Sequence, residues 1–156
     1  MTLKVRPITA DAFAPFGEVL VPPTSPSRDY FSDALANLRP AAPPNISLAR
    51  IEAAKTLPLT MTEMERHEFS SQTFIPMGLE PYLVVVARHG SDGRPDVEAA
   101  CAFLAEGGTG ITYRANVWHH PMTVLAPATF AIVMWADGTE GDEEFVDVAP
   151  TLIEAP

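Results

Sequence analysis

The chain has 156 residues, of which 47% are hydrophobic and 19% charged, so we expect one globular domain over residues 1–156 and exclude a disordered chain. Its 20 acidic residues outnumber its 10 basic residues and give a net charge of −10, which argues against a nucleic-acid or membrane partner. The 16 prolines disfavour long helices and favour short strands joined by loops.

Cys101 is the only cysteine, which excludes an intramolecular disulfide and a cysteine-based structural zinc site. The N-terminus does not have the pattern of a signal peptide, and no apolar run reaches the length of a membrane span, so we expect a cytoplasmic protein. Residues 137–156 contain seven acidic residues and no lysine or arginine, which predicts a solvated terminus.

The first part of the chain alternates between short elements and breaks. Residues 2–6 alternate apolar and charged side chains, which predicts a strand with one face exposed to solvent. Thr9 is a suitable N-cap for a short helix over residues 10–16. A strand over residues 18–21 precedes a proline-rich loop, and residues 30–38 are expected to hold a helical turn or two.

Residues 46–51 predict another strand, in which Arg50 shares one face with Ile46 and Leu48, while Ser47 lies on the other. A buried arginine on an apolar face needs a partner, so Arg50 is a candidate for holding an anionic ligand. The alternative, preferred on these residues alone, is that its stem covers apolar surface while its charged head reaches water.

The segment 64–69 has period-two spacing that places Glu65 and His67 on one face of a strand and Arg66 on the other. Further strands are expected over residues 72–76, 82–87, 129–135 and 145–148, while residues 96–105 fit either a helix or an irregular edge. Eight to ten short strands at close spacing predict a mainly β protein with a few short helices, folded as an antiparallel barrel or double-stranded jelly roll.

The stretch 107–123 contains three glycines, a short β-prone run and the adjacent pair His119 and His120. Neighbouring residues of a strand point to opposite faces, so at most one of the two histidines can face a given pocket. We expect one of them to face a small-molecule site. The alternative is that both stabilise a turn at the edge of a loop.

His67, Gln72, His119 and an arginine would together form a coherent set if the barrel brings their segments face to face. Histidine suits acid–base work near neutral pH, an arginine suits a carboxylate, and an amide suits a urea group. The same residues form a reduced metal site, in which Glu65 or Gln72 joins the two histidines. The small number of histidines favours a site that requires no metal.

These residues resemble the two motifs of the cupin superfamily. In the second motif, G-x5-P-x-G-x2-H-x3-N, only the glycine and the histidine are kept, as Gly108 and His119. The other positions of this motif are held by Arg114, Asn116 and Thr123. In the first motif, Glu65 and His67 stand for the paired histidines, and Gln72 stands for the glutamate. Of the first motif's metal ligands only His67 is therefore kept, together with His119 from the second motif.

A closer resemblance covers most of the chain. The runs MTEMERHEFSSQTFIPM, PYLVVVA and GITYRANVWHHPM are similar to the ureidoglycolate lyase family of allantoin degradation, also described as ureidoglycolate hydrolase. The resemblance implies a cupin-like β-barrel, usually a homodimer, that cleaves ureidoglycolate to glyoxylate and urea. It implies a small-molecule substrate and no required cofactor. The alternative is a divalent metal bound by His67, Gln72 and His119.

The implied reaction assigns roles to the residues above. His67 and His119 would transfer protons, in an order that the sequence leaves open, and Gln72 would contact the urea or carbonyl group. Substrate contacts are assigned to Arg50 or Arg66 for the carboxylate, and to Ser47 and His120. Two alternatives stay open: an amidohydrolase that releases ammonia from the same substrate, and a non-catalytic cupin that binds a small carboxylate.

Overall fold

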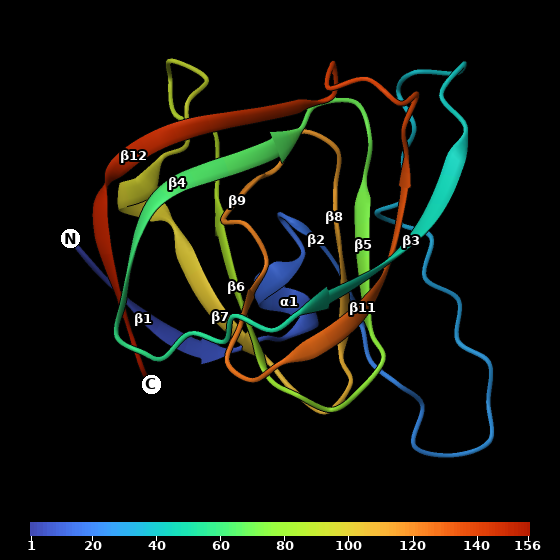
Figure 1. The fold of residues 1–156 in the computed structure, drawn as a ribbon, viewed down its shortest axis with the longest axis horizontal. Coiled ribbons are helices and arrows are strands. Elements are labelled where there is room, and N and C mark those ends of the chain that lie inside the picture. Colours follow the sequence, from blue (N-terminus) through green and yellow to red (C-terminus); the bar gives the residue numbers. More distant parts are fainter.

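The computed structural model describes all 156 residues, and two β-sheets form its framework (Figure 1). The first has the strand order β10 (Thr123–Val124), β6 (Tyr82–Ala87), β7 (Cys101–Ala105), β1 (Thr2–Pro7), β12 (Glu143–Glu154), β4 (Leu59–His67) and β9 (Trp118–His119). The second has the order β2 (Gly17–Leu20), β8 (Gly110–Tyr113), β5 (Gln72–Pro76), β11 (Ala128–Trp135) and β3 (Pro44–Ile51). Because β9 pairs with both β4 and β6, the first sheet closes into a barrel.

The predicted mainly β fold is confirmed, with three corrections. β1 runs parallel to both β12 and β7, so the barrel is not wholly antiparallel. The predicted helical turn within residues 30–38 is wrong: the segment has bends and one bridge, from Asn37 to Ser70. Residues 96–105 divide into the short helix η1 (Val97–Ala99) and the strand β7.

The predicted helix near the N-terminus is present but shorter, as α1 (Ala10–Phe13). Thr9 caps it as expected, because its hydroxyl accepts a hydrogen bond from the Ala12 amide at 3.2 Å. Neither α1 nor η1 is long and apolar enough to cross a membrane.

The protein has two apolar cores, on opposite sides of β6. Leu83 and Val85 point into the closed barrel, whereas Val84 and Val86 point into the space between the barrel and the five-stranded sheet. This arrangement explains why the whole of β6 is apolar, because both of its faces are buried. The second space, called the inter-sheet space here, also holds the candidate functional residues.

Strand β4 places charged side chains in the inter-sheet space. Met64 points into the closed barrel and is fully buried there. Its neighbours Glu65 and His67 belong to the opposite face of the strand and are also buried, so the predicted alternation is confirmed.

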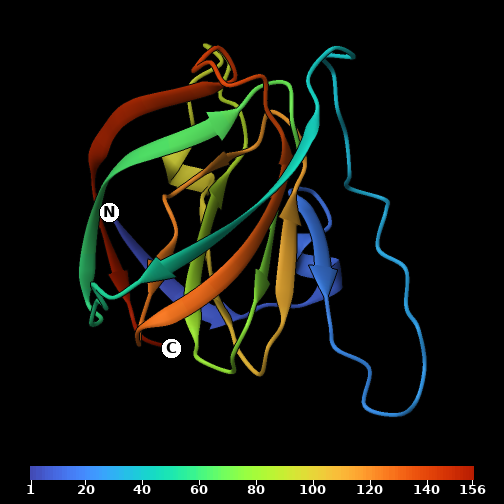
Figure 2. The same cartoon turned by 45° about the vertical axis from the view of Figure 1, so that its right-hand side comes forward.

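The segment 21–43 forms a long connection that projects away from the two sheets (Figure 2). It contains many of the prolines that the sequence placed in loops. The strands hold His67, Gln72 and His119 in place, whereas Arg39 comes from this connection.

Candidate functional site

Glu65, His67 and His119 converge at one end of the inter-sheet space. Glu65 and His119 are cross-strand neighbours on β4 and β9, and Nε2 of His119 lies 3.4 Å from Oε1 of Glu65. The two imidazole rings have centroids 6.0 Å apart. One nitrogen or oxygen atom from each residue lies within 4.8 Å of the others. The fold therefore joins two segments that are about fifty positions apart in the sequence.

The ring of His119 is held in one orientation by its surroundings. Tyr113 stacks on it with a centroid distance of 4.1 Å and an interplanar angle of 16°. Nδ1 of His119 lies 2.9 Å from the Val117 carbonyl oxygen, which can only accept, so Nδ1 carries a proton. In the neutral ring, Nε2 then bears the lone pair and faces Glu65.

Burial and mutual charge set the protonation of this cluster. Burial lowers the pKa of His67, and the neighbouring His119 lowers it further, against the opposing effects of Glu65 and Asp142. Burial alone would raise the pKa of Glu65, but its contact with His119 and the charges of His67 and His120 outweigh burial and lower it. Near neutral pH the site thus pairs an ionised carboxylate with a neutral His67.

The enclosed side-chain polar atoms that have no hydrogen-bond partner are concentrated around this cluster. They are Arg39 Nε, His67 Nδ1, Gln72 Oε1, His119 Nε2 and Asp142 Oδ2. Folded proteins rarely leave such atoms unpaired, so each needs an explanation. Oδ2 of Asp142 lies 3.5 Å from Nδ1 of His67 and 3.7 Å from Nη2 of Arg39, so these three residues form a connected group. A polar ligand at this site would give Gln72 Oε1 and His119 Nε2 partners.

Gln72 completes the wall opposite the histidines. It pairs across the sheet with Tyr113 on β8, and paired residues share a face. Because Tyr113 stacks on His119, Gln72 also belongs to the face that looks toward the histidines. The structure therefore brings together His67, Gln72 and His119, the three residues that the sequence assigned to catalysis.

The two arginines assigned to substrate binding lie elsewhere. Arg50 is on the outer face of β3, where its guanidinium bonds Glu52 at 2.7 Å and reaches Thr129. Arg66 points away from Glu65 and His67, and it pairs with Glu144 at 2.6 Å. Neither arginine is brought to the histidines, because strand alternation places each on the opposite face of its own strand.

Ser47 and His120 have different surroundings. Ser47 is exposed and pairs with Ile132, whose side chain packs on the inter-sheet core, so Ser47 borders this space. His120 directly follows β9, and its Nδ1 donates to the Glu63 carbonyl at 3.1 Å. It lines a separate hollow of about 260 Å³ beside Lys55.

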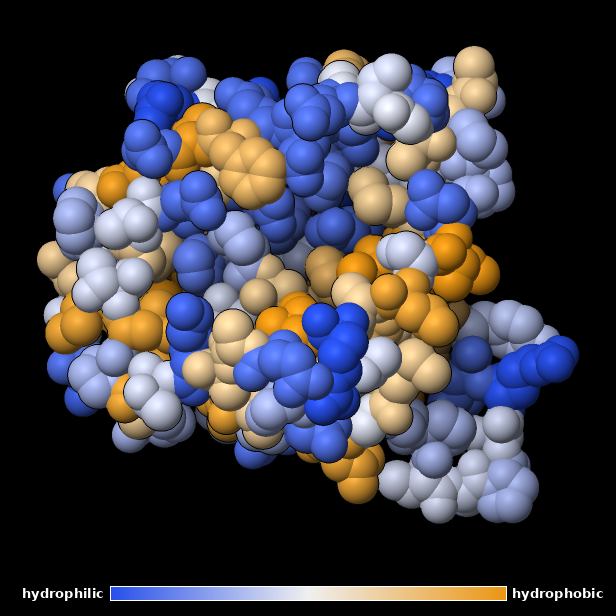
Figure 3. All heavy atoms as spheres, viewed as in Figure 1, coloured by the Kyte–Doolittle hydropathy of each residue, from blue (hydrophilic) through white to orange (hydrophobic).

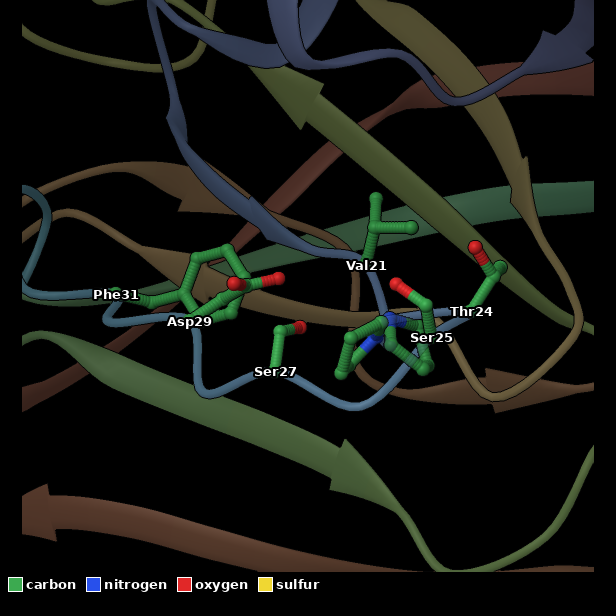
Figure 4. A pocket seen from close by; sticks show the side chains of 8 residues that line it. Val21, Thr24, Ser25, Ser27, Asp29 and Phe31 are labelled. Carbon is green, nitrogen blue, oxygen red and sulfur yellow. The ribbon is translucent and has the colours of Figure 1, made fainter.

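The largest hollow of the surface does not lie at the candidate site. Figure 3, viewed as Figure 1, shows hydrophilic side chains gathered over the end of β4 and the start of β5. The largest hollow, of about 460 Å³, lies instead within the projecting connection (Figure 4). It is lined by Val21, Pro22, Pro23, Thr24, Ser25, Ser27, Asp29 and Phe31. None of the clustered residues belongs to it.

Sequence reasoning missed Arg39 and Asp142. Asp142 belongs to the acidic run that predicted a solvated terminus, yet it is only 5% exposed. The pairing of Glu143 with His67 on β12 and β4 brings it to the site. No local sequence pattern predicts this pairing, because the two strands are more than seventy positions apart in the sequence.

The donor set of Glu65, His67 and His119 fits a divalent cation. Two imidazole nitrogens and one carboxylate are common ligands for such ions, and Nε2 of His119 has no hydrogen-bond partner in the protein. The third donor beside the histidines in this cluster is Glu65.

A closed barrel packed on a second sheet, with two histidines and a carboxylate buried between them, defines a cupin-like enzyme. The family model described as ureidoglycolate lyase matches residues 1–154, and the chain belongs to this family. It is 40% identical over 142 residues to a putative ureidoglycolate lyase of Agrobacterium fabrum, which covers 90% of this chain and 87% of the relative. Ureidoglycolate lyases of Rhizobium etli and Pseudomonas fluorescens are 38% and 36% identical, each over 99% of this chain and 96% and 98% of theirs.

Proposed function

We propose that this protein is a ureidoglycolate lyase that cleaves ureidoglycolate to glyoxylate and urea in allantoin degradation. The observation that carries the proposal is the buried group of His67, Gln72 and His119, in which Gln72 Oε1 and His119 Nε2 have no hydrogen-bond partner. Family membership supplies the substrate, because the relatives are named for this reaction.

The reaction needs one base and one acid. The substrate carbon bears a hydroxyl, a carboxylate and a urea nitrogen; as the hydroxyl proton leaves, the C–O bond becomes a carbonyl and the C–N bond breaks. We assign the base to His67, which is neutral because burial lowers its pKa. The departing urea nitrogen takes a proton from the doubly protonated form of His119, whose Nε2 lies 3.4 Å from Oε1 of Glu65.

Gln72 suits the urea group, because its amide both donates and accepts hydrogen bonds and its Oε1 has no partner in the protein. Ser47 borders the same space and can add a contact. Arg50 or Arg66 was assigned to the substrate carboxylate. To bind it, Arg50 would have to leave Glu52, or Arg66 would have to leave Glu144.

The proposed elimination requires no metal, because acid and base are both supplied by imidazoles. If a divalent cation binds, Glu65, His67 and His119 would hold it, and it would supply Lewis-acid polarisation of the substrate oxygens. In that case Gln72 keeps its contact with the urea group, while the proton-transfer roles of the histidines would be reassigned.

The test is a product assay on chelator-treated protein, following glyoxylate, urea and ammonia together against the spontaneous rate. We expect glyoxylate and urea in equal amounts. Ammonia in place of urea would establish an amidohydrolase, and binding without acceleration would establish a non-catalytic cupin. Activity that disappears with the chelator and returns with a divalent ion would overturn the metal-free mechanism only.

We also propose that the protein acts in the cytoplasm as a homodimer through the outer face of the five-stranded sheet. Leu48, Ala131 and Ile75 are neighbours in register on this face, and Ile46 and Leu48 are 74% and 68% exposed. A contiguous apolar sheet face of this kind is typical of an interface. The single unpaired cysteine, Cys101, requires no oxidising compartment.

Light scattering coupled to size-exclusion chromatography tests this arrangement. The wild-type chain should elute with twice the mass of one chain, and Leu48→Glu should shift it to one chain, since a charge would be buried without a partner. Glu68→Lys, on an exposed residue away from this face, is the matched control and should leave the dimer intact. A wild-type monomer at micromolar concentration would contradict the proposal.

A further inference from the structure

Asp142 is a buried aspartate within an otherwise exposed acidic segment. Its Oδ1 accepts a hydrogen bond from the Phe69 amide at 2.6 Å, and its backbone carbonyl accepts one from the Glu68 amide at 2.9 Å. These two amides belong to the residues that directly follow His67. The carboxylate is therefore fixed to the backbone that carries the candidate base.

The second oxygen of the same carboxylate faces the histidine. Oδ2 of Asp142 lies 3.5 Å from Nδ1 of His67, and both atoms are enclosed without a hydrogen-bond partner. Nη2 of Arg39 lies 3.7 Å from that oxygen, and Nη1 of Arg39 is held by Asp137 at 3.1 Å. A buried carboxylate is costly without a positive charge nearby, and Arg39 supplies it.

The other nitrogen of His67 differs from Nδ1. Nε2 makes no hydrogen bond within the protein and does not belong to the fully enclosed atoms. Of the two ring nitrogens, it is therefore the one that a ligand in the inter-sheet space can reach. A base in this position must carry its proton on Nδ1 and its lone pair on Nε2.

We propose that Asp142 is the positioning residue of His67. It accepts the Nδ1 proton, fixes the ring in the Nδ1–H form, and presents the Nε2 lone pair to the hydroxyl of the substrate. Arg39 holds the aspartate in place from its far side. This role rests on the proposed lyase function, in which His67 is the base. It follows the general pattern in which a carboxylate orients a histidine through one nitrogen while the other nitrogen acts.

Asp142→Asn tests the role with little change in size. The asparagine amide can donate to Nδ1, which would place the ring proton on Nε2 and remove the base. We expect kcat to fall by about 10²–10⁴-fold, the range for the loss of a general base, with KM within about threefold. Asp147→Asn is the matched control, because Asp147 is an exposed aspartate on β12 outside this group, and it should retain wild-type kcat.

Nitrogen NMR of the His67 ring in chelator-treated protein gives a second, independent readout. The wild-type ring should show the Nδ1–H form, and Asp142→Asn should convert it to the Nε2–H form. A wild-type ring in the Nε2–H form, or an unchanged kcat in folded Asp142→Asn, would overturn the proposal. If Asp142→Asn does not fold, the wild-type spectrum alone decides. If the wild-type protein does not cleave ureidoglycolate, the proposed function fails, while the spectrum still tests the positioning of the ring.

Discussion

The inter-sheet space has two halves that are buried alike but packed in opposite ways. In the apolar half, Phe130 meets Phe74 and Tyr82 edge to face, with ring centroids 6.0 Å and 5.2 Å apart. In the polar half, His67 and His119 keep ring nitrogens without partners. The first half follows the rules of a stable core, and the second departs from them at the candidate site.

The boundary between the halves is narrow. On β5, Gln72 belongs to the polar half and Phe74, two residues on and on the same face, to the apolar half. Tyr113 touches both, because it packs edge-on against Phe74 and stacks on His119. One rigid sheet thus supports both halves, so a functional side chain is held as firmly as a core side chain.

The largest effect should come from the polar half. His119→Asn should lower kcat by about 10²–10⁴-fold, because it removes the proposed acid. The free energy of unfolding should fall by no more than about 1–3 kcal/mol, since the change removes the hydrogen bond from Nδ1 to the Val117 carbonyl and the contact with Glu65. Steady-state kinetics and thermal unfolding on the same sample measure both quantities. His89→Asn, at an exposed histidine outside the cluster, is the control and should keep full activity.

The apolar half should show the reverse. Phe130→Ala should lower the free energy of unfolding by about 3–5 kcal/mol, because it leaves a cavity among packed rings. The folded fraction should retain its kcat, since Phe130 does not contact the histidines. Urea unfolding and kinetics at low temperature measure the two effects. A folded Phe130→Ala protein with a large loss of kcat would contradict the division into halves.

Gln72→Leu should raise the free energy of unfolding and lower kcat/KM. Its buried Oε1 has no partner, so an apolar side chain of similar size should raise the free energy of unfolding by about 1 kcal/mol. The same change should lower kcat/KM by about tenfold, because the urea group loses one hydrogen bond. A loss of stability would mean that the amide already has a partner in the folded protein. Unfolding in urea, compared with Gln72→Glu, separates the effects of polarity and charge.

The sequence predicted the faces of single strands better than the way distant strands pair, for physical reasons. Alternation along a strand is local, so the faces of Glu65, His67 and Arg66 could be read directly. The closure of the barrel through β9 and the parallel pairing of β1 depend on distant contacts. Asp142 shows the limit: its neighbours in sequence are acidic and exposed, and only the pairing of β12 with β4 buries it.

The smallest effect is expected at Arg50, outside both halves. Its guanidinium is exposed on the outer face of β3 and paired with Glu52, and exposed pairs contribute little to stability. Arg50→Gln should therefore leave KM for ureidoglycolate within about twofold of wild type, because an exposed pair on this face makes no contact with the inter-sheet space. Initial-rate kinetics over a range of substrate concentrations measure this, with Arg88→Gln as an exposed control. A KM increased at least tenfold in Arg50→Gln alone would show that Arg50 leaves Glu52 to bind the substrate carboxylate, and that the site extends beyond the inter-sheet space.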